Sequence, residues 1–175
     1  MPPLSVPQLV CLAVAAAACA TDLKSRRIPN WLTLSAGAGA LGFFLVGQGW
    51  HGLAWSAAGW AVGLAMFFPF FLLRGIGGGD VKLMAALGAW LGPASTVWLA
   101  LYAAIAGGPL ALAVAFSKGY AKQAVANVWG LLGYWRLAGV RPHPGLTLET
   151  AQAGTPRLPY ALPIAAGLVL TLWLR

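Results

Sequence analysis

Residues 53–73 form a run of 21 positions without one charged side chain, and this run constrains the fold more than any other feature. About 20 apolar residues in a helix are enough to cross the hydrocarbon core of a bilayer. Only 8% of the whole chain is charged, against about 25% in a typical soluble domain. The sequence therefore predicts an all-α polytopic membrane protein, with residues 1–175 forming a single domain.

Six apolar segments are expected to be transmembrane helices. The fourth and fifth come from one apolar stretch, residues 81–117, which would be about 55 Å long as a single helix. Two crossings of a ~30 Å core fit this length only if one of them is short. We therefore divide the stretch at Gly92-Pro93 into a short fourth helix and a longer fifth. The six segments are residues 4–20, 31–46, 53–73, 81–91, 94–116 and 159–174.

The basic residues predict the orientation and one class of partner. With six crossings and the N-terminus outside, ten of the eleven Lys and Arg residues fall on the cytoplasmic side, and only Arg175 falls outside. This is the bias typical of cytoplasmic loops in membrane proteins. The formal net charge of +8 is scattered between apolar runs, so no polar surface could carry a nucleic-acid-binding patch. We expect membrane lipid, and not nucleic acid, as a partner.

Three further features concern the first segment and the stretch between the fifth and sixth segments. The stretch "AAAACAT" resembles a signal-peptide cleavage site, but no positive region precedes the apolar run, so we expect the first helix to be retained. Residues 118–157 form the one extended non-spanning stretch, in which residues 119–139, with aromatic, small and sparse basic residues, predict an interfacial helix on the cytoplasmic face and residues 140–157 predict an exposed loop. Cys11 and Cys19 are too few for a four-ligand zinc site, and they are interpreted as small apolar side chains.

The chain contains only three acidic residues, Asp22, Asp80 and Glu149. Asp22 closes the first helix and Asp80 opens the fourth, so both are expected at the cytoplasmic ends of helices. Asp22 and Asp80 each have an interpretation that is purely structural. Asp80 could cap its helix by accepting from the first free N–H groups, and Asp22 could pair at the surface with the basic residues that follow it.

Taken together, the two aspartates indicate a catalytic pair. If their helices pack, the carboxyl groups can share one proton. One group can then activate a water as a general base while the other acts as a general acid, which is aspartyl-protease chemistry. The glycines at 77, 78 and 79 allow a sharp turn and a close approach of another chain. They do not form a phosphate loop, because Val81 and Leu83 flank Lys82.

Three motifs in order resemble the type IV prepilin peptidases, a family of intramembrane aspartyl proteases. "GGGDVKLMAALG" is similar to the family's Gly-x-Gly-Asp-x-Lys-Leu motif, "DLKSRRIPNWLTL" resembles its first-aspartate region, and "RLPYALPIAAGLVL" resembles its last helix. The resemblance implies that Asp22 and Asp80 are catalytic. It also implies motif or substrate-approach positions at Gly77, Gly78, Gly79, Lys82, Pro29, Asn30, Pro159 and Tyr160.

The resemblance also implies a substrate and a location. Members of the family remove the basic leader from prepilins and pseudopilins at the cytoplasmic face of the bacterial inner membrane. The small size is similar to that of the stand-alone peptidases of tight-adherence (Flp) pili. The chain lacks the cysteine tetrad of larger members, so we expect no N-methyltransferase activity, no metal and no other cofactor. The oligomeric state is not indicated.

Two other classes of protein stay open at this stage. A small transporter or channel could use Asp22 and Asp80 as an ion or proton relay, although the other helices offer few polar residues for a pathway. A non-catalytic assembly protein could use glycine-rich stretches such as "AGAGALG" to pack on partner helices.

Overall fold

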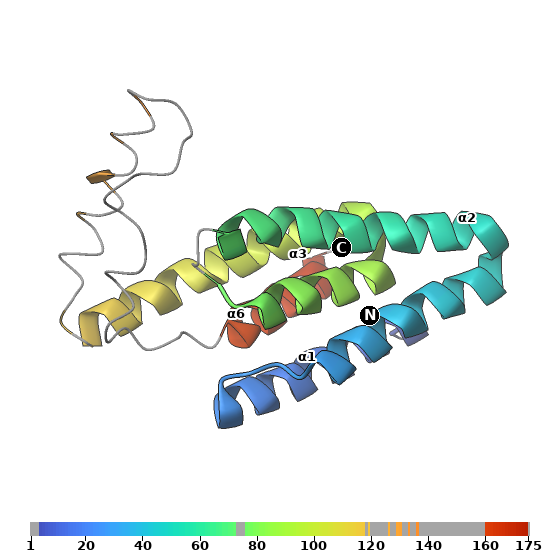
Figure 1. Cartoon of the computed structure of the whole chain (residues 1–175), viewed down its shortest axis with the longest axis horizontal. Coiled ribbons are helices and arrows are strands. Elements are labelled where there is room, and N and C mark those ends of the chain that lie inside the picture. The colour runs from blue at the N-terminus through green and yellow to red at the C-terminus, as the bar shows by residue number, and fades with distance from the viewer. Residues whose placement is uncertain are drawn as a thin grey trace. The chain divides into compact units, whose positions relative to one another are not determined.

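The computed structural model describes residues 4–72, 76–117 and 160–174, together with the single positions 119, 126, 129, 130, 133 and 136. The described residues form helices and no strand, as the all-α prediction requires. The helices are α1 (Val6–Ser25), α2 (Asn30–Leu72), α3 (Gly78–Ser117) and α6 (Ala161–Leu174) (Figure 1).

The chain divides into two compact units, and the helices that carry the predicted site belong to the first. This unit comprises Met1–Gly107 and Pro159–Arg175, and the second comprises Gly108–Leu158. Within the first unit, α1 packs against both α6 and α2.

The connection from α1 to α2 is short and sharply turned. At the end of α1, Arg26 adopts a left-handed conformation with φ 53°, and its N–H donates to the carbonyl oxygen of Asp22 at 2.8 Å. This is a common way to satisfy the last free carbonyls of a helix. Pro29 then directly precedes α2, where its fixed φ and missing N–H are well tolerated. Asp22 therefore lies in the last turn of α1.

Both long helices fold back on themselves at a single glycine (Figure 1). Gly49 interrupts α2 with φ 63° and ψ −149°, and Gly92 interrupts α3 with φ 74° and ψ 172°. Beyond the second break, the Thr96 hydroxyl lies 3.4 Å from the carbonyl oxygen of Gly88, eight positions earlier. A straight helix would separate these two residues by about 12 Å. The interruption predicted at Gly92-Pro93 is confirmed.

The predicted number of transmembrane helices is not supported. Among the described residues, three helices are long and apolar enough to cross a membrane: α1, α2 and the part of α3 from Gly78 to Leu110. The predicted second and third segments lie in α2 on either side of the break at Gly49, and the fourth and fifth lie in α3 on either side of the break at Gly92. The sixth corresponds to α6, which has 14 residues and is shorter than a usual span. The interfacial helix predicted for residues 119–139 lies outside the described residues, apart from single positions.

The first half of α3 is the centre of the unit. The side chains of Leu83, Met84 and Leu87 are completely buried there. Gly88 faces Gly59 of α2 so closely that a Cβ atom on either glycine would overlap the carbonyl oxygen of the other. Small residues at such contacts let helix backbones approach in a membrane environment.

Two hydrogen bonds attach this central helix to both halves of α2. The indole N–H of Trp90 donates to the carbonyl oxygen of Ala36 at 2.9 Å. The hydroxyl of Ser56 donates to the carbonyl oxygen of Ala89 at 2.8 Å. Because both bonds are buried, they hold α3 against α2 in one register.

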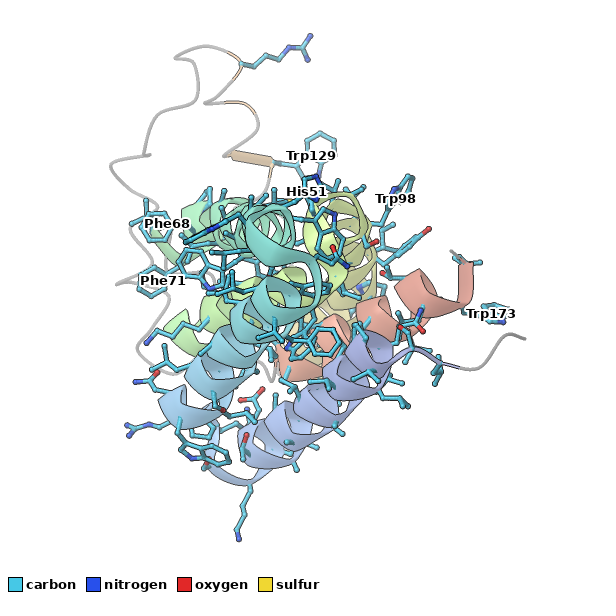
Figure 2. All side chains as sticks on the ribbon, turned by 90° about the vertical axis from the view of Figure 1, so that its right-hand side faces the viewer. His51, Phe68, Phe71, Trp98, Trp129 and Trp173 are labelled. Atoms are coloured by element: carbon cyan, nitrogen blue, oxygen red, sulfur yellow. The ribbon has the colours of Figure 1, made fainter. Side chains whose placement is uncertain are left out.

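Many large apolar side chains face outward from the helices. Phe68 and Phe71 project from α2, and Trp173 projects from α6 (Figure 2). Val46 and Trp50 are 89% and 80% exposed. A water-soluble monomer rarely exposes so much contiguous apolar surface, so this outer surface agrees with the prediction of a membrane protein.

Candidate active site

Asp22 is buried at the end of α1 and is bound by the start of α6. Its side chain is 7% exposed, and its Oδ2 atom accepts a hydrogen bond from the main-chain N–H of Ala161 at 3.3 Å. Ala161 is the first residue of α6, where helix N–H groups have no partner within the helix. Asp22 is therefore buried among helix ends, and not at the solvated surface where an ion pair with the following basic residues was considered.

Asp80 is the third residue of α3, and its carboxylate binds the helix start. The side chain is 8% exposed, and Oδ2 accepts from the N–H of Gly77 at 3.0 Å. The Asp80 N–H in turn donates to the Gly77 carbonyl oxygen at 3.1 Å. A side chain three positions into a helix that reaches back in this way forms half of a capping box. Asp80 therefore takes part in capping α3, but from the third helical position and through Gly77, and it is not itself the N-cap residue.

The Asp80 carboxyl group lies within the electrostatic field of Asp22. Tyr160, the residue before α6, lies in the field of Asp80 as well. Burial and the negative charge of Asp80 both raise the pKa of the Tyr160 phenol. Because Ala161 binds Asp22 and the adjacent Tyr160 is influenced by Asp80, the start of α6 is close to both acidic side chains.

The three glycines before Asp80 have different neighbours. A Cβ atom on Gly79 would lie 3.1 Å from the Ile28 Cβ, and one on Gly78 would lie 3.4 Å from the Phe71 ring. A Cβ on Gly77 would lie 3.0 Å from Oδ2 of Asp80. In the described part of the chain, the close approach expected at these glycines is therefore made by the protein's own side chains.

Two of the predicted motif positions are joined by a side-chain contact. Lys82 Nζ donates a hydrogen bond to Oδ1 of Asn30 at 2.9 Å, across 52 positions of sequence. Pro29, next to Asn30, accepts a main-chain hydrogen bond from Leu32 at 3.1 Å in the first turn of α2. Pro159 lies outside the described residues.

Two residues beside Asp22, namely Cys19 and Ala161, were not predicted from the sequence as part of the site. The Cys19 thiol donates to the carbonyl oxygen of Ala161 at 3.3 Å. Cys19 precedes Asp22 by three positions on one helix, so helical spacing could have placed the two on one face. Ala161 acts only through its main chain, and no sequence pattern could have identified it. No group of three or more potential metal ligands occurs among the described residues.

These contacts define the class of protein. The chain is a helical membrane protein with two buried carboxylates at helix ends, Asp22 where α1 meets the start of α6 and Asp80 in the first turn of α3.

The model of the type IV leader peptidase family matches residues 9–112. This is more than half of the chain, and the chain belongs to this family, as the sequence resemblance predicted. The matched residues include both Asp22 and Asp80. At the family level the protein is a protease of the prepilin peptidase type. No curated protein and no solved structure was found to match the chain.

Proposed function

We propose that this protein is an intramembrane aspartyl endopeptidase that removes the basic leader from type IV prepilins and pseudopilins of the Flp-like class. Asp22 and Asp80 form its catalytic pair. The observation that carries the proposal is that two carboxylates on separate helices are both buried and bound at helix ends, in a chain with only three acidic residues. Two such groups placed together supply the general base and the general acid of peptide hydrolysis.

The contacts of the two carboxylates suit this chemistry. Each has one oxygen oriented by a main-chain N–H group, Ala161 for Asp22 and Gly77 for Asp80. In the reaction, one carboxylate takes a proton from a water that attacks the scissile carbonyl carbon. The other carboxyl group, protonated at the start, donates its proton toward the carbonyl oxygen. Fixed positions lower the cost of orienting these groups in the transition state.

The distribution of charge supports a cytoplasmic site in the bacterial inner membrane. Lys24, Arg26 and Arg27 follow Asp22 directly, and Lys82 follows Asp80, all with exposed side chains. The same helix ends therefore carry both the acidic pair and a group of cations, and cations are retained on the cytoplasmic side of bacterial membranes.

The substrate proposed here has two parts, a basic leader and an apolar helix. The apolar helix would lie beside the peptidase in the bilayer, so that the junction reaches the helix ends that hold the two aspartates. The net charge of +8 repels a basic leader, so the junction must be recognised by local contacts. Methylation of the new N-terminus is not part of the proposal.

Co-expression of the full chain with a Flp-type prepilin tests the function. Asp22→Asn and Asp80→Asn should each abolish cleavage, while immunoblots of the membrane fraction show unchanged insertion. Glu149→Gln is the matched control, because it neutralises the third acidic residue and should leave cleavage intact. Full processing by both aspartate variants would disprove the assignment. The mass of the cleaved product shows whether a methyl group has been added.

A further inference from the structure

We propose that Lys82 and Asn30 act as a pair of positioning residues for the reaction, holding the connection between α1 and α2 against the first turn of α3. The inference rests on the proposed function, because it concerns how the two aspartates are kept in place. It gives a role to Lys82 and Asn30, for which sequence motifs alone indicate none.

The first observation is the contact itself. Lys82 is the exposed residue within a stretch of α3 that is otherwise buried from Asp80 to Trp90. Its ammonium group does not extend freely toward lipid headgroups. It donates to Asn30 Oδ1 at 2.9 Å, and Asn30 is the first residue of α2. A hydrogen bond with a charged donor is stronger than one between neutral groups.

A second contact joins the same two segments independently. Ile28, two residues before Asn30, is buried and lies against Gly79, where an added Cβ would come within 3.1 Å of the Ile28 Cβ. The connection therefore contacts α3 at Gly79 through an apolar side chain and at Lys82 through a hydrogen bond. Asp80 lies between these two positions.

The other end of the connection leads to Asp22. The N–H of Arg26 donates to the Asp22 carbonyl oxygen at 2.8 Å, and the Ser25 hydroxyl donates to the Thr21 carbonyl oxygen at 2.8 Å. The end of α1 is thus bonded into the turn that continues to Ile28 and Asn30. If the connection moved away from α3, Asp22 would move relative to Asp80. A displacement of about 1 Å in a catalytic group can cost about a hundredfold in rate.

Kinetics on the reconstituted full chain, with a synthetic peptide spanning a prepilin leader junction, test the role. Lys82→Met and Asn30→Leu should each lower kcat roughly tenfold or more with little change in KM, because the reacting groups are misplaced. Lys82→Arg and Asn30→Asp keep a donor and an acceptor and should recover most of kcat. The double variant Lys82→Met/Asn30→Leu should be no slower than the slower single variant. Lys24→Met, an exposed lysine of α1, is the matched control.

Several kinetic outcomes would overturn the inference. A rise in KM with unchanged kcat would show that Lys82 binds the substrate directly. Losses that multiply in the double variant would show that the two side chains act separately. A loss of kcat that neither Lys82→Arg nor Asn30→Asp recovers would also contradict a role for the hydrogen bond.

A second measurement does not depend on peptidase activity. In a chain with Cys11→Ala and Cys19→Ser, the buried position 28 is labelled as Ile28→Cys with a maleimide. Adding Lys82→Met should accelerate this labelling several-fold, while labelling of Leu23→Cys, an exposed position of α1, should not change. Equal rates at position 28 would disprove the positioning role even if the aspartates are catalytic. Faster labelling in a protein whose aspartate variants still cleave would instead contradict the proposed function.

Discussion

The carboxylate of Asp22 accepts a hydrogen bond from the main-chain N–H of Ala161 at 3.3 Å, although 139 positions of sequence separate the two residues. The bond joins the last turn of α1 to the first turn of α6. Asp22 therefore has a structural contact in addition to its proposed catalytic role. Variants that separate the two roles are the most informative ones at this position.

Asp22→Asn and Asp22→Ala should differ in stability but not in activity. Asparagine keeps a carbonyl oxygen that can accept from Ala161, whereas alanine leaves a buried N–H group without a partner. The loss of that acceptor should cost about 1–3 kcal/mol. Both variants should lack cleavage, because neither has a carboxyl group. Thermal unfolding in detergent should show a lower midpoint for Asp22→Ala only, and equal midpoints would show that the bond contributes little.

Alanine substitutions at the glycines before Asp80 should have graded effects on cleavage. In Gly79→Ala the new Cβ would press on Ile28 at 3.1 Å, so the connection between α1 and α2 must move. In Gly78→Ala the new Cβ would make an ordinary contact with the Phe71 ring at 3.4 Å. We expect Gly79→Ala to lower kcat roughly tenfold through displacement of the connection, and Gly78→Ala to have a small effect. The reverse order, measured with the junction peptide, would contradict this account of the glycines.

The contact between α2 and α3 predicts a strong packing effect at Gly88. A Cβ there would overlap the carbonyl oxygen of Gly59. Overpacking of this kind costs typically about 1–3 kcal/mol, so Gly88→Ala should lower the thermal midpoint clearly. Gly42→Ala is the matched control within a helix, because no atom lies within 4 Å of its added Cβ. That variant should be neutral or more stable by about 0.5–1 kcal/mol. Similar midpoints for both variants would show that the helices do not approach so closely.

The raised pKa of Tyr160 predicts that the folded protein loses stability at high pH. The pKa is raised by burial and by the charge of Asp80, so the folded protein holds the phenolic proton more tightly than the unfolded chain. The resulting stability is complete below the unfolded pKa of about 10 and is lost as pH rises through the folded pKa.

The midpoints of thermal unfolding, measured between pH 9 and pH 12, test whether stability falls as the pH rises. The midpoint of the wild-type protein should fall more steeply than that of Tyr160→Phe. Asp80→Asn should reduce the steepness, because it removes the repulsion but leaves the burial. A wild-type slope no steeper than that of Tyr160→Phe would contradict the prediction.

Much of the helical architecture follows from local features of the sequence. The apolar runs predict the helices, and Gly92-Pro93 predicts the break that the structure shows. The prediction of six transmembrane helices went beyond what these local features can establish. The break within α2 depends on the positive φ of a single glycine, Gly49, which a sequence pattern does not reveal.

The proposed active site also combines features that the sequence predicts with features that depend on the tertiary structure. The sequence alone singled out Asp22 and Asp80, because they are two of only three acidic residues and both are expected at the cytoplasmic ends of apolar helices. Only the tertiary structure decided that Ala161 binds Asp22 and that Lys82 binds Asn30. Hydrophobic pattern and residue type are local properties of the chain. The distance between residues on different helices depends on how those helices pack, down to the overlap that a single Cβ on Gly88 would cause.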